Sequence, residues 1–223
     1  MSSGSAPHRY RDSTRPEMLA YVPKETRQVL EVGCHTGHFG RAIKSRCGAI
    51  VWGVEPNPET AAIAAEGLDR VFNGFFDVGL ALPERFFDLI TFTDVLEHMP
   101  DPWGALRLAS EKLTLDGMVL ISVPNLRHID NLVHILRERD FNYEPEGVRD
   151  RTHLRFFTKK SAPRLFDGTG LKMTFLDGIN ESAWACSFPR RLAFRLFPAY
   201  FSDTKHIQFA MAGRLSTHDA IAR

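Results

Sequence analysis

The chain has 223 residues, of which 43% are hydrophobic and 25% are charged, and its formal net charge at pH 7 is +1. This length is enough for one domain with a sizeable core. The near-neutral charge argues against a nucleic-acid binder, which would show a basic stripe. No apolar run approaches about 18 residues, so we expect no transmembrane helix. Three cysteines form no disulfide framework and no apolar leader follows Met1, so we expect a cytoplasmic protein.

The first half of the chain alternates between apolar runs and helical stretches. We expect strands at residues 28–32, 50–54, 70–73, 87–92 and 118–123. Helices are expected after Asn57-Pro58 and Asp101-Pro102, because a capping side chain followed by proline suits the first turn of a helix. This alternation predicts an α/β fold with a doubly wound, mostly parallel sheet. Ligands of such sheets bind beyond the carboxyl ends of the strands.

The second half of the chain carries two insertions within the same single domain, which spans residues 1–223 and has a flexible start at 1–14. Residues 126–157 begin with an amphipathic pattern and predict a lid or substrate insertion after the fifth strand. Residues 180–203 form an aromatic and arginine-rich insertion before a last strand at 207–212. We expect this second insertion to pack over the sheet edge or to form a homodimer contact. An anionic membrane surface is the alternative.

A glycine-bearing turn between the first strand and the next helix is the strongest sign of a ligand site. It contains Gly33 and Gly37, and the following strand ends on Glu55, which can hold the two hydroxyls of a ribose. The dinucleotide fingerprint needs glycine where His35 stands, and no Walker lysine follows. Histidine tolerates a positive φ, so the turn can still form. These residues therefore predict a site for a nucleoside without phosphates.

Four motifs in the order found here resemble those of class I S-adenosyl-L-methionine-dependent methyltransferases. They are Glu31–Gly37, Gly53–Pro56, Phe87–Ile90 and Asp94–Pro102. The resemblance implies a Rossmann-like sheet of seven strands with one antiparallel strand near its edge, and S-adenosyl-L-methionine as the cofactor. The cofactor-binding residues that it implies are Glu31, Gly33, His35, Gly37, Glu55, Pro56, Asp77, Thr93 and Asp94.

The resemblance also implies what several of these residues contact. Glu31 and the two glycines shape the methionine end of the pocket, and Pro56 packs on the adenine. An acid after the third strand bonds the adenine amino group in the family, and Asp77 is the residue available for this role. Stacking of Phe75 and Phe76 on the ring is the alternative.

The residues after the fourth strand are the candidates for chemistry. Methyl transfer to a hydroxyl requires alignment of the reactants and removal of a proton, and His98 and His153 are candidate general bases. Asp94, Glu97 and His98 share a face if they form one helical turn. The arrangement resembles the metal site of ubiquinone-pathway O-methyltransferases and of small-RNA 2′-O-methyltransferases. That resemblance implies Mg, Mn or Zn held by Asp94, Glu97, His98 and His153; a metal-free base and a purely structural role stay open.

The stretch around His153 mixes charged and aromatic residues, which suits the wall of a polar substrate pocket. Arg149, Arg151 and Arg155 are candidates for holding a phosphate or carboxylate. A similar run occurs in methyltransferases linked to polysaccharide assembly. We therefore expect O-methylation of a small polar acceptor such as a sugar or nucleotide-linked sugar, and no nucleic-acid partner. The alternatives are N- or C-methylation of a metabolite ring, or a catalytically silent nucleoside-binding regulatory protein, which His35 would favour.

Overall fold

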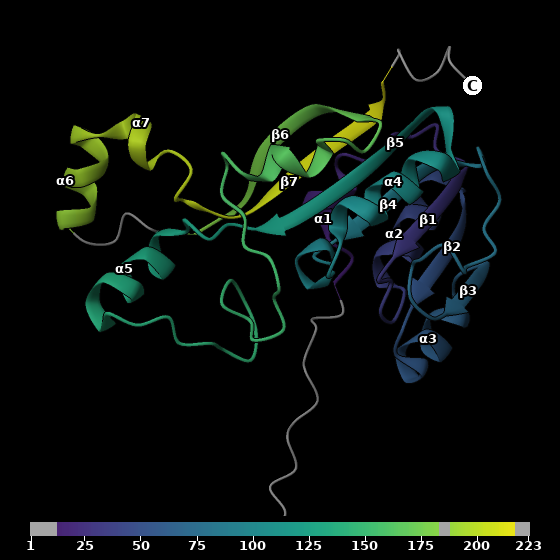
Figure 1. Cartoon of the computed structure of the whole chain (residues 1–223), viewed down its shortest axis with the longest axis horizontal. Helices are drawn as coiled ribbons and strands as arrows, with labels where there is room; N and C mark the ends of the chain where they lie inside the picture. The colour runs from purple at the N-terminus through teal and green to yellow at the C-terminus, as the bar shows by residue number, and fades with distance from the viewer. Residues whose placement is uncertain (1–12, 183–187, 217–223) are drawn as a thin grey trace, which may run out of the picture.

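The computed structural model describes residues 13–182 and 188–216, so most of the expected flexible start and Trp184 lie outside it. The elements follow the alternating order expected from the sequence, up to the fifth strand (Figure 1). In chain order they are α1 (Pro16–Leu19), β1 (Gln28–Val32), α2 (His38–Cys47), β2 (Ile50–Glu55), α3 (Pro58–Ala65), β3 (Arg70–Asn73), β4 (Phe87–Thr93), the 3-10 helix η1 (Leu96–His98), α4 (Pro102–Lys112), β5 (Leu113–Pro124), α5 (Ile129–Glu138), the 3-10 helix η2 (Ala162–Phe166), β6 (Leu171–Glu181), α6 (Phe188–Leu196), α7 (Pro198–Phe201) and β7 (His206–Leu215).

One seven-stranded sheet organises the molecule, in the order β3-β2-β1-β4-β5-β7-β6. The first five of these strands are parallel, and β7 runs antiparallel to both of its neighbours. This confirms the predicted doubly wound sheet with an antiparallel strand near its edge. Val32 at the end of β1 pairs with Val54 and Phe92, so β1, β2 and β4 end together. Their shared carboxyl edge is where the order of crossovers reverses and where a ligand is expected.

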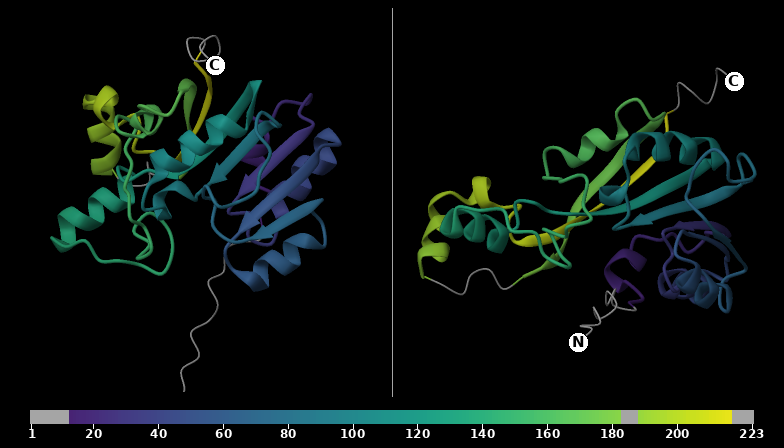
Figure 2. Two further views of the ribbon diagram at one scale, coloured as in Figure 1. Left: turned by 45° about the vertical axis from the view of Figure 1, so that its right-hand side comes forward. Right: turned by 60° about the horizontal axis from the view of Figure 1, so that its bottom comes forward.

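Helices cover both faces of the sheet and divide the core in two (Figure 2, right). On one face α1, α2 and α3 bury Met18, Phe39 and Ile43 against the sheet. On the other face α4 and η2 bury Leu106 and Phe166 among a larger set of aromatic and aliphatic side chains. Because each strand of the centre is apolar on both sides, the parallel strands read as nearly continuous hydrophobic runs.

The last strand, expected at 207–212, is longer in the structure and spans His206–Leu215. Residues 171–181 pair with residues 206–215 along a ladder that continues beyond the core. This two-stranded extension carries α6 and α7 at its end, beside α5, far from β3 at the other edge (Figures 1 and 2). α6 packs on α7. Within the described residues, no helix is long and apolar enough to cross a membrane.

Candidate functional site

A pocket of about 410 Å³ opens at the carboxyl edge of β1, β2 and β4. This volume lies within the range of pockets that hold small molecules and cofactors. The residues that line it come from the glycine turn, the tip of β2, the segment after β4, the start of the chain and the loop after α5. They include Ser13, Arg15, Glu31, Gly33, His35, Glu55, Pro56, Thr93, Asp94, His98, Asp150 and Thr152.

The glycine turn brings backbone to the pocket wall because it uses left-handed backbone three times. Gly33 has a φ of 70° and Gly37 a φ of 78°, and a Cβ at Gly33 would lie 2.5 Å from Cγ2 of Val95. His35 has a φ of 47°, in the region that histidine was expected to tolerate. The turn is therefore intact although glycine is replaced at position 35.

Glu55 is fixed at the tip of β2 by the backbone around it. Its Oε2 accepts a hydrogen bond from the amide of His35 at 2.9 Å, and its Oε1 accepts one from the amide of Asn57 at 2.9 Å. The side chain is 7% exposed. A carboxylate offers about four lone-pair sites, so this one retains acceptor capacity for a diol. Neighbouring Pro56 also lines the pocket.

Glu31 is the buried acid beneath the turn. Burial raises its pKa to about 8, against a smaller opposing effect of the Gly40 amide. Its Oε2 has no hydrogen-bond partner among the described residues. A Cβ at Gly40 would lie 2.5 Å from that oxygen and 2.8 Å from Cδ2 of Leu68, so a larger residue there would displace these side chains. At neutral pH this carboxyl is therefore mostly protonated without a ligand, and a cationic group beside it would favour its ionised form.

Asp94, Glu97 and His98 do not form one helical turn, so the condition for a shared face is not met. Asp94 has a left-handed φ of 56°, and the 3-10 helix spans only Leu96–His98. The Asp94 carboxylate accepts a hydrogen bond from Ser122 Oγ at 2.8 Å and one from Gln208 Nε2 at 2.6 Å. It also pairs with Arg15 at 2.6 Å. Asp94 lines the pocket, but it stands outside the group of metal-ligating atoms described below.

Arg15 is a charged pocket residue that sequence reasoning missed. Its side chain is 18% exposed, and it bonds Glu17 at 2.7 Å as well as Asp94. Ser13 and Arg15 carry the start of the described chain onto the pocket wall. No local sequence pattern predicts the contact between Arg15 and Asp94, because the two residues are 79 positions apart in the sequence. The Arg15 guanidinium places a positive charge on this pocket wall, which a zwitterionic ligand would meet.

Three of the four predicted metal ligands do come together. Glu97, His98 and His153 each offer one ligand atom, and these atoms lie within 4.8 Å of one another. The two imidazole centroids are 4.7 Å apart. The backbone carbonyl of Glu97 holds the loop after α5 against η1. It accepts hydrogen bonds from the amides of Leu154 and Arg155 at 2.7 and 3.1 Å.

The chemistry of this cluster follows from burial and hydrogen bonding. Glu97 is fully buried, both of its carboxylate oxygens lack a hydrogen-bond partner among the described residues, and burial raises its pKa well above the usual range. Burial also lowers the pKa of His153. The Nδ1 atoms of His98 and His153 lie 3.3 Å from the carbonyls of Thr152 and Val148, which can only accept. These contacts favour the tautomer in which Nδ1 donates and Nε2 keeps the lone pair.

Several other predicted residues lie away from the pocket or are used structurally. Asp77 is exposed and its Oδ1 accepts the Gly79 amide at 2.8 Å, outside the pocket lining. Phe76 packs on Phe92 in the core, while Phe75 is 74% exposed. The geometry thus gives no support to an adenine contact from any of the three.

The arginines proposed to hold an anion differ in their surroundings. Arg149 is buried and bonds Asn131, Glu144 and the carbonyl of residue 142, so it stabilises the loop instead. Arg155 bonds the Pro100 carbonyl at 2.7 Å. Cys34, in the glycine turn, is buried, and burial raises the pKa of its thiol.

Comparison with known proteins agrees with this geometry. Residues 5–175 match a family model described as a methyltransferase domain. The chain is 26% identical over 178 residues to a ubiquinone biosynthesis O-methyltransferase of Vibrio atlanticus, covering 74% of this chain and 73% of that protein. It superposes with a TM-score of 0.67 on a SAM-dependent methyltransferase from Archaeoglobus fulgidus, at 18% identity, covering 90% and 94% of the two chains. An S-adenosylmethionine-dependent methyltransferase from Mesorhizobium loti gives a TM-score of 0.61 at 19% identity, covering 91% and 98%.

Proposed function

The chain belongs to the S-adenosyl-L-methionine-dependent methyltransferases of class I fold, and from this premise we propose that it methylates a hydroxyl of a small polar acceptor. A sugar or nucleotide-linked sugar is the acceptor class we favour. The polar side chains of Ser13, Asp150 and Thr152 at the pocket support this class, because they can hydrogen-bond hydroxyl groups. An acceptor in polysaccharide biosynthesis fits the same chemistry.

The single observation that carries the proposal is the pair of imidazoles of His98 and His153, whose ring centroids lie 4.7 Å apart and of which His98 lines the cofactor pocket. A sulfonium is already a good leaving group, so the protein needs to align the acceptor and remove its proton. His98 lines the pocket, and its Nδ1 lies 3.0 Å from Thr152 Oγ1, which donates to Asp150 Oδ1 at 2.7 Å. This chain of bonds orients the ring and leaves Nε2 as the basic atom. The relatives named O-methyltransferases also act on oxygen.

The same cluster fits a divalent cation. Two orphaned oxygens of a fully buried glutamate are an expensive arrangement unless a proton or a cation satisfies them. Glu97, His98 and His153 together offer the mixed oxygen and nitrogen ligands that Zn²⁺ and Mn²⁺ accept. Asp94 would not take part, because Arg15, Ser122 and Gln208 already hold it. When bound, such an ion supplies a Lewis acid that lowers the pKa of a coordinated hydroxyl.

The function is tested by incubating the chain with labelled cofactor and a panel of free sugars, nucleotide sugars, catechols and amines. We expect label in a hydroxyl acceptor, and loss of transfer in His98→Ala and His153→Ala. His134→Gln, in α5, is the matched control and should keep full transfer. Label only in an amine, or full transfer in both pocket histidine variants, would contradict O-methylation at this cluster.

The metal is tested separately by binding. We expect Mn²⁺ or Zn²⁺ to raise the thermal midpoint of chelator-treated protein, and Glu97→Gln to abolish that rise. Full transfer in excess chelator, together with no thermal response to either ion, would leave the His98 base as the mechanism. Retained S-adenosylhomocysteine binding in each variant shows that the fold is intact.

A further inference from the structure

The surface of α6 and α7 is apolar and basic at once, and it has no function in the pocket. Leu192, Leu196, Phe197 and Tyr200 are 44%, 60%, 61% and 64% exposed. Four large exposed hydrophobic side chains within nine residues form a cluster, which a protein surface rarely leaves uncovered without a binding role. We call these four residues, with Arg191 and Arg195, the distal surface.

The residue spacing on α6 separates its apolar and basic side chains into two stripes. Leu192 and Leu196 are four residues apart and lie on one face, and Arg191 and Arg195 form a parallel stripe one position away. Phe194 and Phe201 pack with tilted rings at 5.1 Å between centroids, so they join the two helices. Among the described side chains these two rings join the helices, whereas the four apolar residues of the distal surface stay largely exposed.

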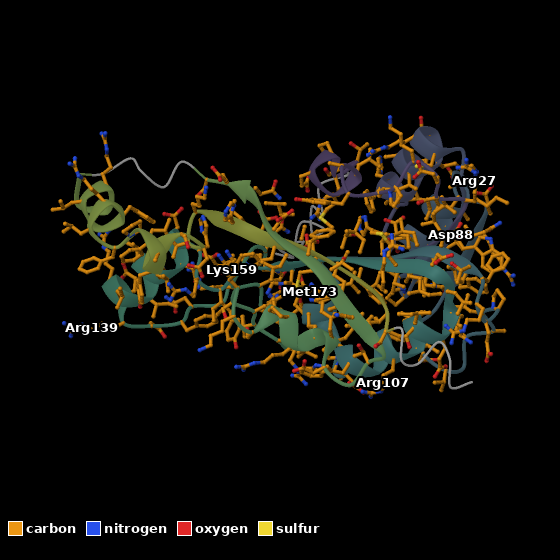
Figure 3. The ribbon with its side chains drawn as sticks, turned by 90° about the horizontal axis from the view of Figure 1, so that it is seen from above. Arg27, Asp88, Arg107, Arg139, Lys159 and Met173 are labelled. Atoms are coloured by element: carbon orange, nitrogen blue, oxygen red, sulfur yellow. The ribbon has the colours of Figure 1, made fainter. Side chains whose placement is uncertain are left out.

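The helix pair is held in a fixed orientation. Arg127 pairs with Asp203 at 2.9 Å, donates to the Tyr200 carbonyl at 2.8 Å, and stacks its guanidinium 4.9 Å from the Tyr200 ring. The side-chain amide of Asn125 donates to the carbonyls of Asp203 and His206. The distal surface is thus presented rigidly from the end of the β6–β7 ladder, at the end of the molecule opposite Arg27 and Asp88, where Figure 3 also shows Arg139.

The charge of residues 188–205 indicates the chemical character of the partner of the distal surface. Residues 188–205 contain Arg190, Arg191, Arg195 and Lys205 but a single acid, Asp203, whereas the whole chain is close to neutral at +1. Asp203 is taken by Arg127, and Lys205 by Glu181. Within residues 13–182 and 188–216, Arg191 and Arg195 have no ion pair. Two copies meeting symmetrically through this surface would bring the same arginines together, so a second copy is disfavoured. The partner must be anionic and must accept leucine and aromatic side chains.

We propose that the distal surface docks the protein on an anionic lipid bilayer. The apolar stripe would enter the boundary between headgroups and acyl chains, and Arg191 and Arg195 would contact the lipid phosphates. Tyr200 and Phe197 suit this boundary, since aromatic side chains are favoured there. The neighbouring α5 segment carries Arg137 and Arg139 as well as Asp130, Glu138 and Asp140, so it adds no net positive charge to the contact. The proposal does not depend on which acceptor is methylated.

The test is co-sedimentation of the full chain with vesicles of phosphatidylcholine alone or with about one third phosphatidylglycerol. We expect binding to the anionic vesicles only, and its loss in about 0.5 M NaCl, where the Debye length is about 4 Å. Arg191→Gln with Arg195→Gln should lower the partition coefficient about 30-fold. Leu196→Ser with Phe197→Ser should lower it about 10-fold or more.

Matched controls lie elsewhere on the molecule. Lys24→Gln with Lys172→Gln removes two exposed positive charges, and Leu115→Ser removes an exposed leucine, so both should bind as the unmodified chain does. Equal binding to neutral vesicles, no binding to either kind, or loss of binding in the controls would overturn the proposal. Dimerisation that the distal-surface variants abolish, without vesicle binding, would assign the surface to a second copy. A thermal shift with S-adenosylhomocysteine shows that every variant is folded.

Discussion

Replacing Glu55 by alanine tests the ribose assignment directly. The carboxylate accepts two backbone hydrogen bonds, from His35 and Asn57, both at 2.9 Å. These bonds aim it at the pocket without using all of its lone pairs. Alanine removes the charge and the acceptors together, whereas glutamine keeps the shape and one acceptor oxygen. We therefore expect the alanine variant to lose more affinity than the glutamine variant.

The magnitude follows from the kind of bond that is lost. A hydrogen bond to a charged group contributes about 1.5–3 kcal/mol, so Glu55→Ala should weaken cofactor binding about 10-fold to 150-fold. The backbone amides of residues 35 and 57 also lose their partners, but both lie at the wet rim of the pocket and can be solvated. The loss is thus expected mainly in affinity, with a small change in the free energy of unfolding.

Isothermal titration with S-adenosylhomocysteine measures this affinity, and chemical denaturation measures stability. Glu59→Ala is the control, since Glu59 is exposed in the first turn of α3 and outside the pocket lining. An affinity within twofold of the unmodified chain in a folded Glu55→Ala variant would refute the ribose assignment, because no other acid lies at the tip of β2.

Three further perturbations probe the same pocket. The Glu31 carboxyl has a pKa raised from 4.5 to about 8 in the folded chain. The folded state therefore holds an extra proton between these pH values, and the free energy of unfolding falls as pH rises through this window. Glu31→Gln should flatten that fall in a series of denaturation curves, and an unchanged slope would contradict the raised pKa of Glu31. Gly33→Ala places a Cβ 2.5 Å from a Val95 methyl, whereas the control Gly48→Ala, at a similar φ of 64°, meets no atom within 4 Å. Backbone strain costs about 1–3 kcal/mol at each site. Only the Gly33 variant should lose further stability and cofactor affinity, as measured by thermal shift with and without S-adenosylhomocysteine. Arg15→Gln removes a cation from the pocket wall and should weaken cofactor binding about 10-fold, measured by titration; unchanged affinity would reduce Arg15 to a structural role.

Local sequence patterns predicted the parallel half of the fold well. The strands expected at 28–32 and 70–73 have the same bounds in the structure. Each is an apolar run ended by glycine or a polar turn, so neighbouring residues decide its limits. The same holds for the caps of α3 and α4, where Asn57 and Asp101 accept amide hydrogen bonds as expected.

The parts that sequence reasoning missed depend on contacts between distant residues. The ladder of β6 and β7 extends past the core because its two strands pair with each other, which no apolar alternation records. Asp94 lies outside the helical turn, and its carboxylate is bonded to Arg15, Ser122 and Gln208 instead. None of these partners is close to Asp94 in the sequence. The cluster of Glu97, His98 and His153 was predictable only through resemblance, and its function is still a prediction.

The bond between Arg15 and Asp94 has a consequence for turnover. It ties the start of the described chain to the segment after β4 across one wall of the pocket, at 2.6 Å. If spent cofactor leaves past this wall, it has to displace or bypass the ion pair, and we then expect the residence time of the product to fall as ionic strength rises. A burst of methylated product, followed by a slower steady rate that rises with salt, would be the evidence that this ion pair limits product release.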